Sequence, residues 1–363
     1  MLIAKSLFCS LLITPLLMLS AVAGAAQHCV VLQYHHVNGE TPGITSVTPG
    51  QFQQHLDYLH KNSFHVLPLS EVVDKLQGKR ELPDKCVALS IDDAFESAYS
   101  EAWPRARKYG YPLTVFVSTE SVDQGVGGYM SWEQMREMAK DGVEFQNHSR
   151  SHDHLVRLHG GESMEDWEQR VASEILVVQN RIQAELGSTP TLFAYPYGEY
   201  NVSLQRLIQS MGLVGFGQQS GPAWSDGNFG ALPRFPMNTV YASMRTFPTK
   251  VSTLPLPIVA AEPQEPLVED DVWQPTLTLK FAPGVENSKR LTCYVNGSPD
   301  VEYRWSEDGM VVEVTPKGVL QVGRNRYNCT LPGPEGRYHW YSHNWLRRNA
   351  DGSWYREAIA VGH

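Results

Sequence analysis

The sequence lacks several features that would place it in other classes of protein. Its formal net charge is −9 over 363 residues and it has no basic stripe, so we expect no nucleic-acid partner. After the N-terminal 26 residues, no apolar run is long enough to span a membrane, so we expect no integral membrane segment in the mature chain. Hydrophobic residues make up 42% of the chain, which excludes disorder from end to end. The length suits one barrel-sized domain and a smaller one.

The N-terminus has the pattern of a secretory signal. Lys5 precedes the apolar stretch SLFCSLLITPLLMLSAVA, and AVAGAA offers small residues for cleavage. We therefore predict that residues 1–26 are a signal peptide and that the mature protein is exported, either periplasmic or secreted. An anchor that stays attached to the membrane is the alternative.

Cysteine is scarce, with five residues, and Cys9 would leave with the signal peptide. An even count of four in an exported chain predicts disulfides. Cys29 and Cys86 each begin an apolar run, and the starts of neighbouring parallel strands lie close together. Cys293 and Cys329 both lie in the last hundred residues. We predict the pairs 29–86 and 293–329; four free buried thiols are the alternative.

Short apolar runs alternate with amphipathic segments over the first 220 residues. We expect strands at 29–37, 64–69, 85–93, 112–120, 143–149, 191–198 and 213–220, and helices at 48–62, 70–78, 94–110, 131–142, 161–187 and 201–212. Alternation of this kind predicts parallel pairing, in a doubly wound sheet or a barrel. The polar clusters HHV, DD, NHSRSH and YPYG all follow strand ends, which favours a barrel with its site on that face. Thr48, Ser70 and Ser131 are the expected helix caps.

The last third of the chain differs from the rest. Residues 247–275 are rich in proline without helical periodicity, which predicts a linker or an extended wrapping segment. Short alternating runs with turn signals then predict a small all-β, sandwich-like domain over 276–363. Its aromatic side chains, such as those of RYHWYSHNW, are either core residues or a surface for stacking on sugars.

Two histidines and two aspartates form the main chemical signal. His148 and His152 are four residues apart, and on a helical turn their rings would point the same way. Together with Asp93 they would make an open three-ligand site for zinc or a similar divalent ion. Asp92, beside such a site, could take a proton from water. A His-rich surface loop and a polar turn at a strand end are the alternatives.

A family resemblance supports the metal site. SIDDAFES, HSRSH and FAYPYGEYN, in this order, resemble the three leading motifs of the NodB-type polysaccharide deacetylases, carbohydrate esterase family 4. The resemblance covers about residues 30–240, and the YHHV opening is similar to the bacterial poly-N-acetylglucosamine deacetylase branch. It implies a distorted (β/α) barrel of the NodB type over 27–246. It also implies a metal-dependent hydrolase that removes N-acetyl groups from amino sugars of an extracellular or cell-envelope polysaccharide, releasing acetate.

The resemblance assigns roles to individual residues. Asp92 matches the general base, and Asp93, His148 and His152 match the ligands of a divalent metal, which zinc, cobalt or nickel would fill. Pro196 and Tyr197 match the third motif, which shapes the substrate groove. The backbone N–H of Tyr197 would help to hold the oxyanion of the tetrahedral intermediate.

The sequence departs from the family pattern at several positions. Ala194 stands where many members have arginine, and Arg234 in LPRFPMN is the expected substitute for orienting the base. Ala94 replaces the usual glycine, with little expected effect. The late Leu-x-His motif has no match, so the general acid is unassigned. His35 or His36 could serve, or could simply pack, and we place His35 among the substrate-binding residues.

These departures leave two further functions open. One is a non-catalytic glycan-binding protein that retains the deacetylase scaffold. The other is a deacetylase of small acetyl esters or amides.

Overall fold

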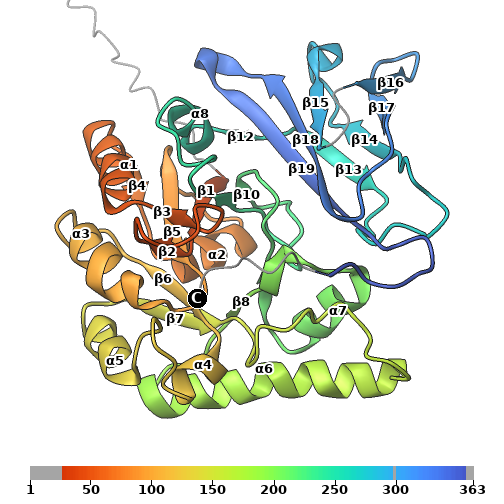
Figure 1. Cartoon of the computed structure of the whole chain (residues 1–363). Helices are drawn as coiled ribbons and strands as arrows, with labels where there is room; N and C mark the ends of the chain where they lie inside the picture. The colour runs from red at the N-terminus through yellow and green to blue at the C-terminus, as the bar shows by residue number, and fades with distance from the viewer. Residues whose placement is uncertain (1–26, 297–299, 357–363) are drawn as a thin grey trace, which may run out of the picture.

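The structure is a computed structural model that describes residues 27–296 and 300–356. The expected signal peptide lies outside the described residues. An α/β domain formed by the first part of the chain and a β domain formed by the last part pack side by side (Figure 1). In the described residues, no helix is both long enough and apolar enough to cross a membrane.

The α/β domain is built on one curled sheet of nine strands. Its path runs β10-β1-β5-β6-β7-β8-β9, with β4 beside β5 and β11 beside β1. The pairs along β1-β5-β6-β7-β8-β9 are parallel, because helical crossovers connect the strands. The strands are β1 (His28–Tyr34), β4 (His65–Val66), β5 (Cys86–Ile91), β6 (Thr114–Val117), β7 (Glu144–Asn147), β8 (Leu192–Ala194), β9 (Val214–Phe216), β10 (Ala223–Trp224) and β11 (Phe235–Pro236).

The segment 229–236 brings the two edges of this sheet together. Leu232 forms a parallel bridge with Phe216 of β9. A few residues later, β11 pairs in parallel with Leu32 and Gln33 of β1. This curled sheet fits the NodB-type α/β fold that the sequence predicts, and it brings the strand ends that carry polar motifs to one face.

Helices cover the outside of the sheet (Figure 1). They are α1 (Pro49–Lys61), α2 (Leu69–Gln77), α3 (Trp103–Arg107), α4 (Thr119–Asp123), α5 (Trp132–Lys140), α6 (Met164–Leu186), α7 (Val202–Ser210) and α8 (Phe247–Val251). Thr48 and Ser131 cap α1 and α5 through capping boxes, as their positions predict. Ser70 is not a cap: α2 begins one residue earlier, and the Ser70 hydroxyl instead donates to Glu144. The expected helix 94–110 is split into a π-helical turn at Ala98–Ala102 and α3, with a proline in the first turn of α3.

The four cysteines form two disulfides. Cys29 is joined to Cys86, and these residues lie at the starts of the adjacent strands β1 and β5. Cys293 is joined to Cys329 between β15 and β18 of the β domain. Both pairings are those that the strand positions predict.

The β domain consists of two four-stranded sheets that share one apolar core, which includes Leu279, Val312 and Trp345. One sheet has the order β12-β19-β18-β15 and the other β13-β14-β17-β16. The strands are β12 (Leu254–Pro255), β13 (Ile258–Glu262), β14 (Leu277–Phe281), β15 (Thr292–Val295), β16 (Val301–Trp305), β17 (Val311–Pro316), β18 (Gly323–Pro332) and β19 (Tyr338–Arg347). A separate short pair, β2 (His36–Val37) and β3 (Ser46–Val47), belongs to the α/β domain.

The proline-rich segment 247–275 is not a free linker. It contains α8, and β12 and β13 each form the first strand of one sheet of the β domain. Proline is tolerated there because an edge strand leaves one row of backbone N–H groups outside the ladder. The segment expected to be a linker or a wrapping segment therefore contributes an edge strand to each sheet of the β domain.

The β domain packs directly on the α/β domain. Leu346 of β19 belongs to the same buried cluster as Trp167 and Tyr195 of the α/β domain. Trp340 of β19 packs edge-on against Phe235, with ring centroids 5.2 Å apart. Trp345 is a core residue, and the Tyr338 side chain is 41% exposed. The two domains therefore share apolar contacts close to the strand ends.

Candidate metal centre and active site

Asp92 and Asp93 directly follow β5, at the face where the polar motifs meet. The backbone N–H of Asp92 donates to Tyr34 O at 2.9 Å, which continues the pairing of β5 with β1. Asp93 and Ala94 then adopt left-handed φ angles of 74° and 61°. Such angles are strained in residues other than glycine and persist where the surroundings hold them. Ala94 therefore carries strain that the family's glycine would avoid.

The Asp92 carboxylate is fully buried and tightly held. Arg234 binds it with both terminal nitrogens, Nη1 to Oδ1 at 2.7 Å and Nη2 to Oδ2 at 2.8 Å. Gln33 Nε2 also donates to Oδ2, at 2.6 Å. Arg234 itself is fixed by its Nε, which donates to Gly217 O at 3.0 Å. Arg234 thus lies beside Asp92. Many family members have an arginine where this chain has Ala194, and Arg234 is the residue expected to take over its role.

This environment keeps Asp92 ionised. Burial alone would raise the pKa of Asp92, but the charge of Arg234 and its hydrogen bonds help to outweigh burial, and the pKa lies below its ordinary value. Of the two oxygens, Oδ2 accepts two hydrogen bonds and Oδ1 accepts one. Oδ1 therefore keeps a lone pair that can accept a proton.

Three side chains converge next to this pair. The Oδ1 atom of Asp93 lies 3.2 Å from His148 Nε2 and 3.3 Å from His152 Nε2. One ligand atom from each residue falls within 4.8 Å of the others. Asp93 Oδ1 and His148 Nε2 are buried, and no hydrogen bond in the described structure satisfies either atom. Buried polar atoms without partners are costly, so this arrangement fits residues that hold a cation.

Backbone contacts orient the His148 ring toward this cluster. Its Nδ1 donates to the carbonyl oxygen of Ala194 at 2.7 Å, since a carbonyl can only accept. In the neutral ring the proton is therefore on Nδ1, which leaves the Nε2 lone pair directed at Asp93. A hydrogen bond from the far nitrogen is the common way to orient a histidine ligand.

His152 reaches the cluster from a loop rather than from a helical turn. Residues 148–152 are irregular, and Ser149 and His152 have left-handed φ angles of 62° and 57°. The N–H of Ser149 donates to Asn147 Oδ1 and that of His152 to Ser149 Oγ. The four-residue spacing thus places both rings together, but the helical geometry expected for it is wrong. Burial lowers the pKa of His152 to about 4, so its ring is neutral at ordinary pH.

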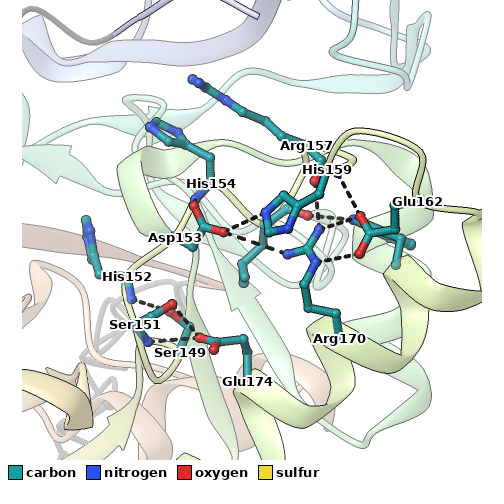
Figure 2. A network of polar contacts seen from close by, with 12 residues as sticks. Ser149, Ser151, His152, Asp153, His154, Arg157, His159, Glu162, Arg170 and Glu174 are labelled. Carbon is teal, nitrogen blue, oxygen red and sulfur yellow. Dashed lines mark hydrogen bonds and ion pairs between the residues drawn. The ribbon is translucent and has the colours of Figure 1, made fainter.

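Helix α6 supports this loop from below (Figure 2). Glu174 accepts hydrogen bonds from both the N–H and the hydroxyl of Ser151, each at 2.8 Å. Arg170 forms an ion pair with Glu162 and donates to the backbone oxygen of Arg157 at 2.8 Å. These contacts fix the segment that carries His152 to a rigid helix.

The third motif forms a short 3₁₀ turn at Pro196–Gly198, directly after β8. Tyr197 has a left-handed φ of 59°, and its ring stacks on His154 with a centroid separation of 3.9 Å. The guanidinium of Arg324, from β18, lies 5.4 Å from the same ring. The turn that carries Tyr197 is therefore held from both domains.

Glu199 ties this turn to the β domain. Its carboxylate is buried and receives His154 Nδ1 at 2.8 Å and Arg324 Nη1 at 3.1 Å. Arg157 and the hydroxyl of Tyr355 also donate to it. Burial raises the pKa of Glu199, but the His154 hydrogen bond and the neighbouring charges more than offset it, so the pKa is lowered.

A groove of about 700 Å³ lies over the cluster, and we call it the central groove. Asp93, His152, Tyr197 and His35 line it. Arg150, Arg324 and Arg326 line it as well, the last two from β18. The groove is therefore built from both domains, with the three-ligand cluster in its wall.

The structure separates the two histidines of the YHHV opening. His35 lines the groove, whereas His36 stacks on Phe95 with ring centroids 3.6 Å apart. Burial lowers the pKa of His36 to about 4. Pro196 is buried behind Tyr197 and does not line the groove. Sequence reasoning missed the roles of Glu199 and the arginines of β18, although Glu199 lies within the FAYPYGEYN motif.

Comparisons with known proteins agree with this arrangement. Residues 79–216 match the family model for polysaccharide deacetylase. YxkH, a candidate polysaccharide deacetylase of Bacillus subtilis, is 26% identical over 205 residues, which cover 56% of this chain and 69% of YxkH. A poly-β-1,6-N-acetyl-D-glucosamine N-deacetylase of Staphylococcus aureus is 25% identical over 194 residues, 52% of this chain and 67% of the relative.

Solved structures show the same fold. The deacetylase PplD of Streptococcus pyogenes, solved with acetate, matches with a TM-score of 0.53 and 25% identity, over 58% of this chain and 93% of PplD. IcaB from Ammonifex degensii matches with a TM-score of 0.53 and 24% identity, over 63% of this chain and 97% of IcaB.

The fold is a NodB-type α/β fold, and the candidate site lies at the carboxyl ends of its curled parallel sheet. Within that class, residues 79–216 match the polysaccharide deacetylase family, and the chain is similar to deacetylases over little more than half of its length.

Proposed function

We propose that this protein is an exported, metal-dependent deacetylase that removes N-acetyl groups from amino sugars of an extracellular or cell-envelope polysaccharide and releases acetate. The observation that carries the proposal is the convergence of Asp93, His148 and His152 beside the ionised Asp92, with Asp93 and His152 in the groove wall. The poly-N-acetylglucosamine deacetylases among its relatives support the substrate class. The two disulfides are consistent with export to an oxidising compartment.

The ligand set suits zinc, and also cobalt or nickel. Two imidazole nitrogens and one carboxylate oxygen leave open positions, as a catalytic divalent site requires. When bound, such an ion lowers the pKa of a coordinated water toward about 7 and polarises a carbonyl. Asp93, His148 and His152 would hold it, and the Ala194 carbonyl keeps His148 in the required tautomer.

The chain's own residues supply the proton transfers and the positioning. Asp92 accepts the proton of the attacking water on Oδ1, and Arg234 keeps that carboxylate oriented and ionised. The N–H of Tyr197 donates to the oxygen that becomes negative when the acetamide carbonyl is attacked. His35, which lines the same groove, is placed to contact the sugar and to protonate the leaving amine.

Asp93→Ala and His148→Ala test the proposal. Both variants should lose acetate release from N-acetylglucosamine oligomers by at least about 10³-fold and should lose bound divalent metal, measured by elemental analysis. His65→Ala, on the exposed strand β4, is the matched control and should retain both. Variants that match the parent's rate would contradict this mechanism. Sugar binding without acetate release by the parent would favour a glycan-binding scaffold, and turnover of monomers only would favour a deacetylase of small amides or esters.

A further inference from the structure

A second hollow opens beside the central groove, on the sheet face of the β domain. It encloses about 320 Å³, and we call it the side pocket. Thr292, Asn328 and Trp340 of the β domain line it, together with Tyr241 and Lys250 from outside that sheet. Pro236, Tyr241 and Arg326 line both hollows, so the side pocket is continuous with the central groove.

The charge of these two hollows is opposite in sign to that of the chain. Among the described residues that line them, the cationic side chains are Arg150, Arg324, Arg326 and Lys250, and Asp93 is the one carboxylate. Asp93 already belongs to the candidate metal centre. A chain of net charge −9 therefore concentrates positive charge along its groove, which favours anionic ligands there.

Two of these cations lack a carboxylate partner. Arg150 pairs with Glu120 and Arg324 with Glu199. Within the described part of the chain, Arg326 and Lys250 form no ion pair with an acidic side chain, and the Lys250 ammonium donates to the backbone oxygen of Tyr241. Both cations are at least partly buried, and Lys250 is 8% exposed. A buried cation without a counter-charge is costly, so it marks a position where a ligand can supply the charge.

Tyr241 lines the same pocket as Arg326 and Lys250, and its aromatic ring offers a surface on which a sugar ring can stack. Its ring is 48% exposed, and Lys250 Nζ lies 5.4 Å from the ring centroid. Lys250 also donates to the backbone oxygen of Tyr241, which fixes the ammonium group beside the ring. Burial lowers the pKa of Lys250 to about 8, which leaves most of the side chain charged at neutral pH.

We propose that Arg326, Lys250 and Tyr241 form a subsite for an acidic sugar unit, so that the enzyme acts on a polysaccharide with anionic groups near its N-acetylated sugars. This inference rests on the proposed function and deepens it. Arg326 and Lys250 would bind the carboxylate or phosphate, and Tyr241 would stack on the sugar ring next to the groove. The β domain then acts as part of the substrate site rather than as an appendage.

Binding to metal-stripped protein tests the subsite separately from turnover. Calorimetric titration in the presence of a chelator compares two hexasaccharides, one of alternating glucuronate and N-acetylglucosamine and the other of neutral N-acetylglucosamine. The acidic hexasaccharide should bind more tightly. Arg326→Gln and Lys250→Met should each weaken it by about tenfold, and should change binding of the neutral one less than twofold.

Arg304→Gln and Lys280→Met remove cations from the other sheet of the β domain and should change neither affinity. Arg326→Lys keeps the charge and should retain most of the binding, which separates a lost contact from a misfolded domain. Equal affinity for both hexasaccharides, or no effect of Arg326→Gln, would overturn the subsite. So would tighter binding of a single-stranded oligonucleotide.

A phosphorylated N-acetylglucosamine oligomer, added as a third ligand, distinguishes phosphate from carboxylate as the anion. Because binding is measured without metal, the absence of the subsite would appear in the binding data alone and would not change acetate release. Failure of the proposed function would instead appear as absent acetate release from every oligomer, whatever the binding.

Discussion

Asp92 and Arg234 form a buried ion pair on which both stability and chemistry depend. Both side chains are fully buried, and the two hydrogen bonds between them are parallel and short. Removing one partner of such a pair leaves an uncompensated buried charge, which costs about 3–5 kcal/mol. The pair therefore offers a direct test of how the active site is held.

Arg234→Gln should lower the free energy of unfolding by about 3–5 kcal/mol at pH 7, measured by urea denaturation. The pKa of Asp92 is lowered in the folded state, so the contribution of the pair is present above the unfolded pKa of about 4 and is lost as pH falls through the folded value. The difference between parent and variant should therefore shrink below about pH 4. Arg304→Gln, at an exposed position of β16, should leave stability unchanged. A constant difference from pH 7 to pH 2 would argue against the ion pair.

His35 and His36 are adjacent in sequence but occupy different environments. His35 faces the groove, and His36 is stacked on Phe95. His35→Gln should lower kcat for acetate release by about 10²-fold, as expected when a proton donor is removed. His36→Gln should alter thermal stability more than kcat. Equal kcat values for the parent and His35→Gln would remove His35 from the reaction.

At the scale of elements, the loop of residues 148–162 is the least regular part of the site and depends on α6. Glu174 holds Ser151 through two hydrogen bonds, directly before the proposed ligand His152 (Figure 2). Loss of such supporting contacts typically weakens metal binding by about 10–100-fold. The helix therefore supports the candidate metal site although none of its residues is a proposed ligand.

Glu174→Gln tests this support. We expect metal affinity to fall by about tenfold, measured by competition with a chromogenic chelator, with little change in melting temperature of the metal-free protein. Glu168→Gln, exposed on the same helix, should leave affinity unchanged. Identical losses in both variants would mean that helix charge, rather than the contact with Ser151, is responsible.

The sequence predicted the helices, the strands and the meeting of Asp93, His148 and His152 better than it predicted what surrounds them. Some features depend only on residues that are close in sequence, such as capping boxes, helical periodicity and the spacing of the two histidines. For this reason α1, α5 and the His148–His152 pair could be predicted from the sequence alone. The edge strands within 247–275 and the arginines of β18 in the groove depend on contacts between distant parts of the chain. Ser70 shows the same limit: its position suits a cap, yet a distant glutamate binds its hydroxyl.

For the whole molecule, the β domain completes the α/β domain. Arg324 and Tyr355 supply two of the partners of the buried Glu199, and Leu346 and Trp340 cover apolar surface. A fragment of residues 27–246 would leave this carboxylate with fewer partners and the apolar surface in water. Exposing core side chains to water and leaving a buried charge with fewer partners both strongly destabilise a fold.

The fragment 27–246 should therefore melt at least about 10 °C below the full chain, measured by circular dichroism. Glu199→Gln in the full chain should reproduce part of the loss, because it removes the charge but keeps the apolar contacts. A fragment that melts with the full chain and releases acetate at the same rate would show that the β domain is dispensable.

The cationic lining of the groove also bears on what happens after each cleavage. Deacetylation turns a neutral acetamide into an ammonium group, so the product carries the same sign of charge as Arg324 and Arg326. Like charges should expel the modified stretch, and the enzyme should not advance along it. We expect single free amines scattered among acetylated units instead of long deacetylated blocks, a pattern that ¹³C NMR of the treated polymer would reveal.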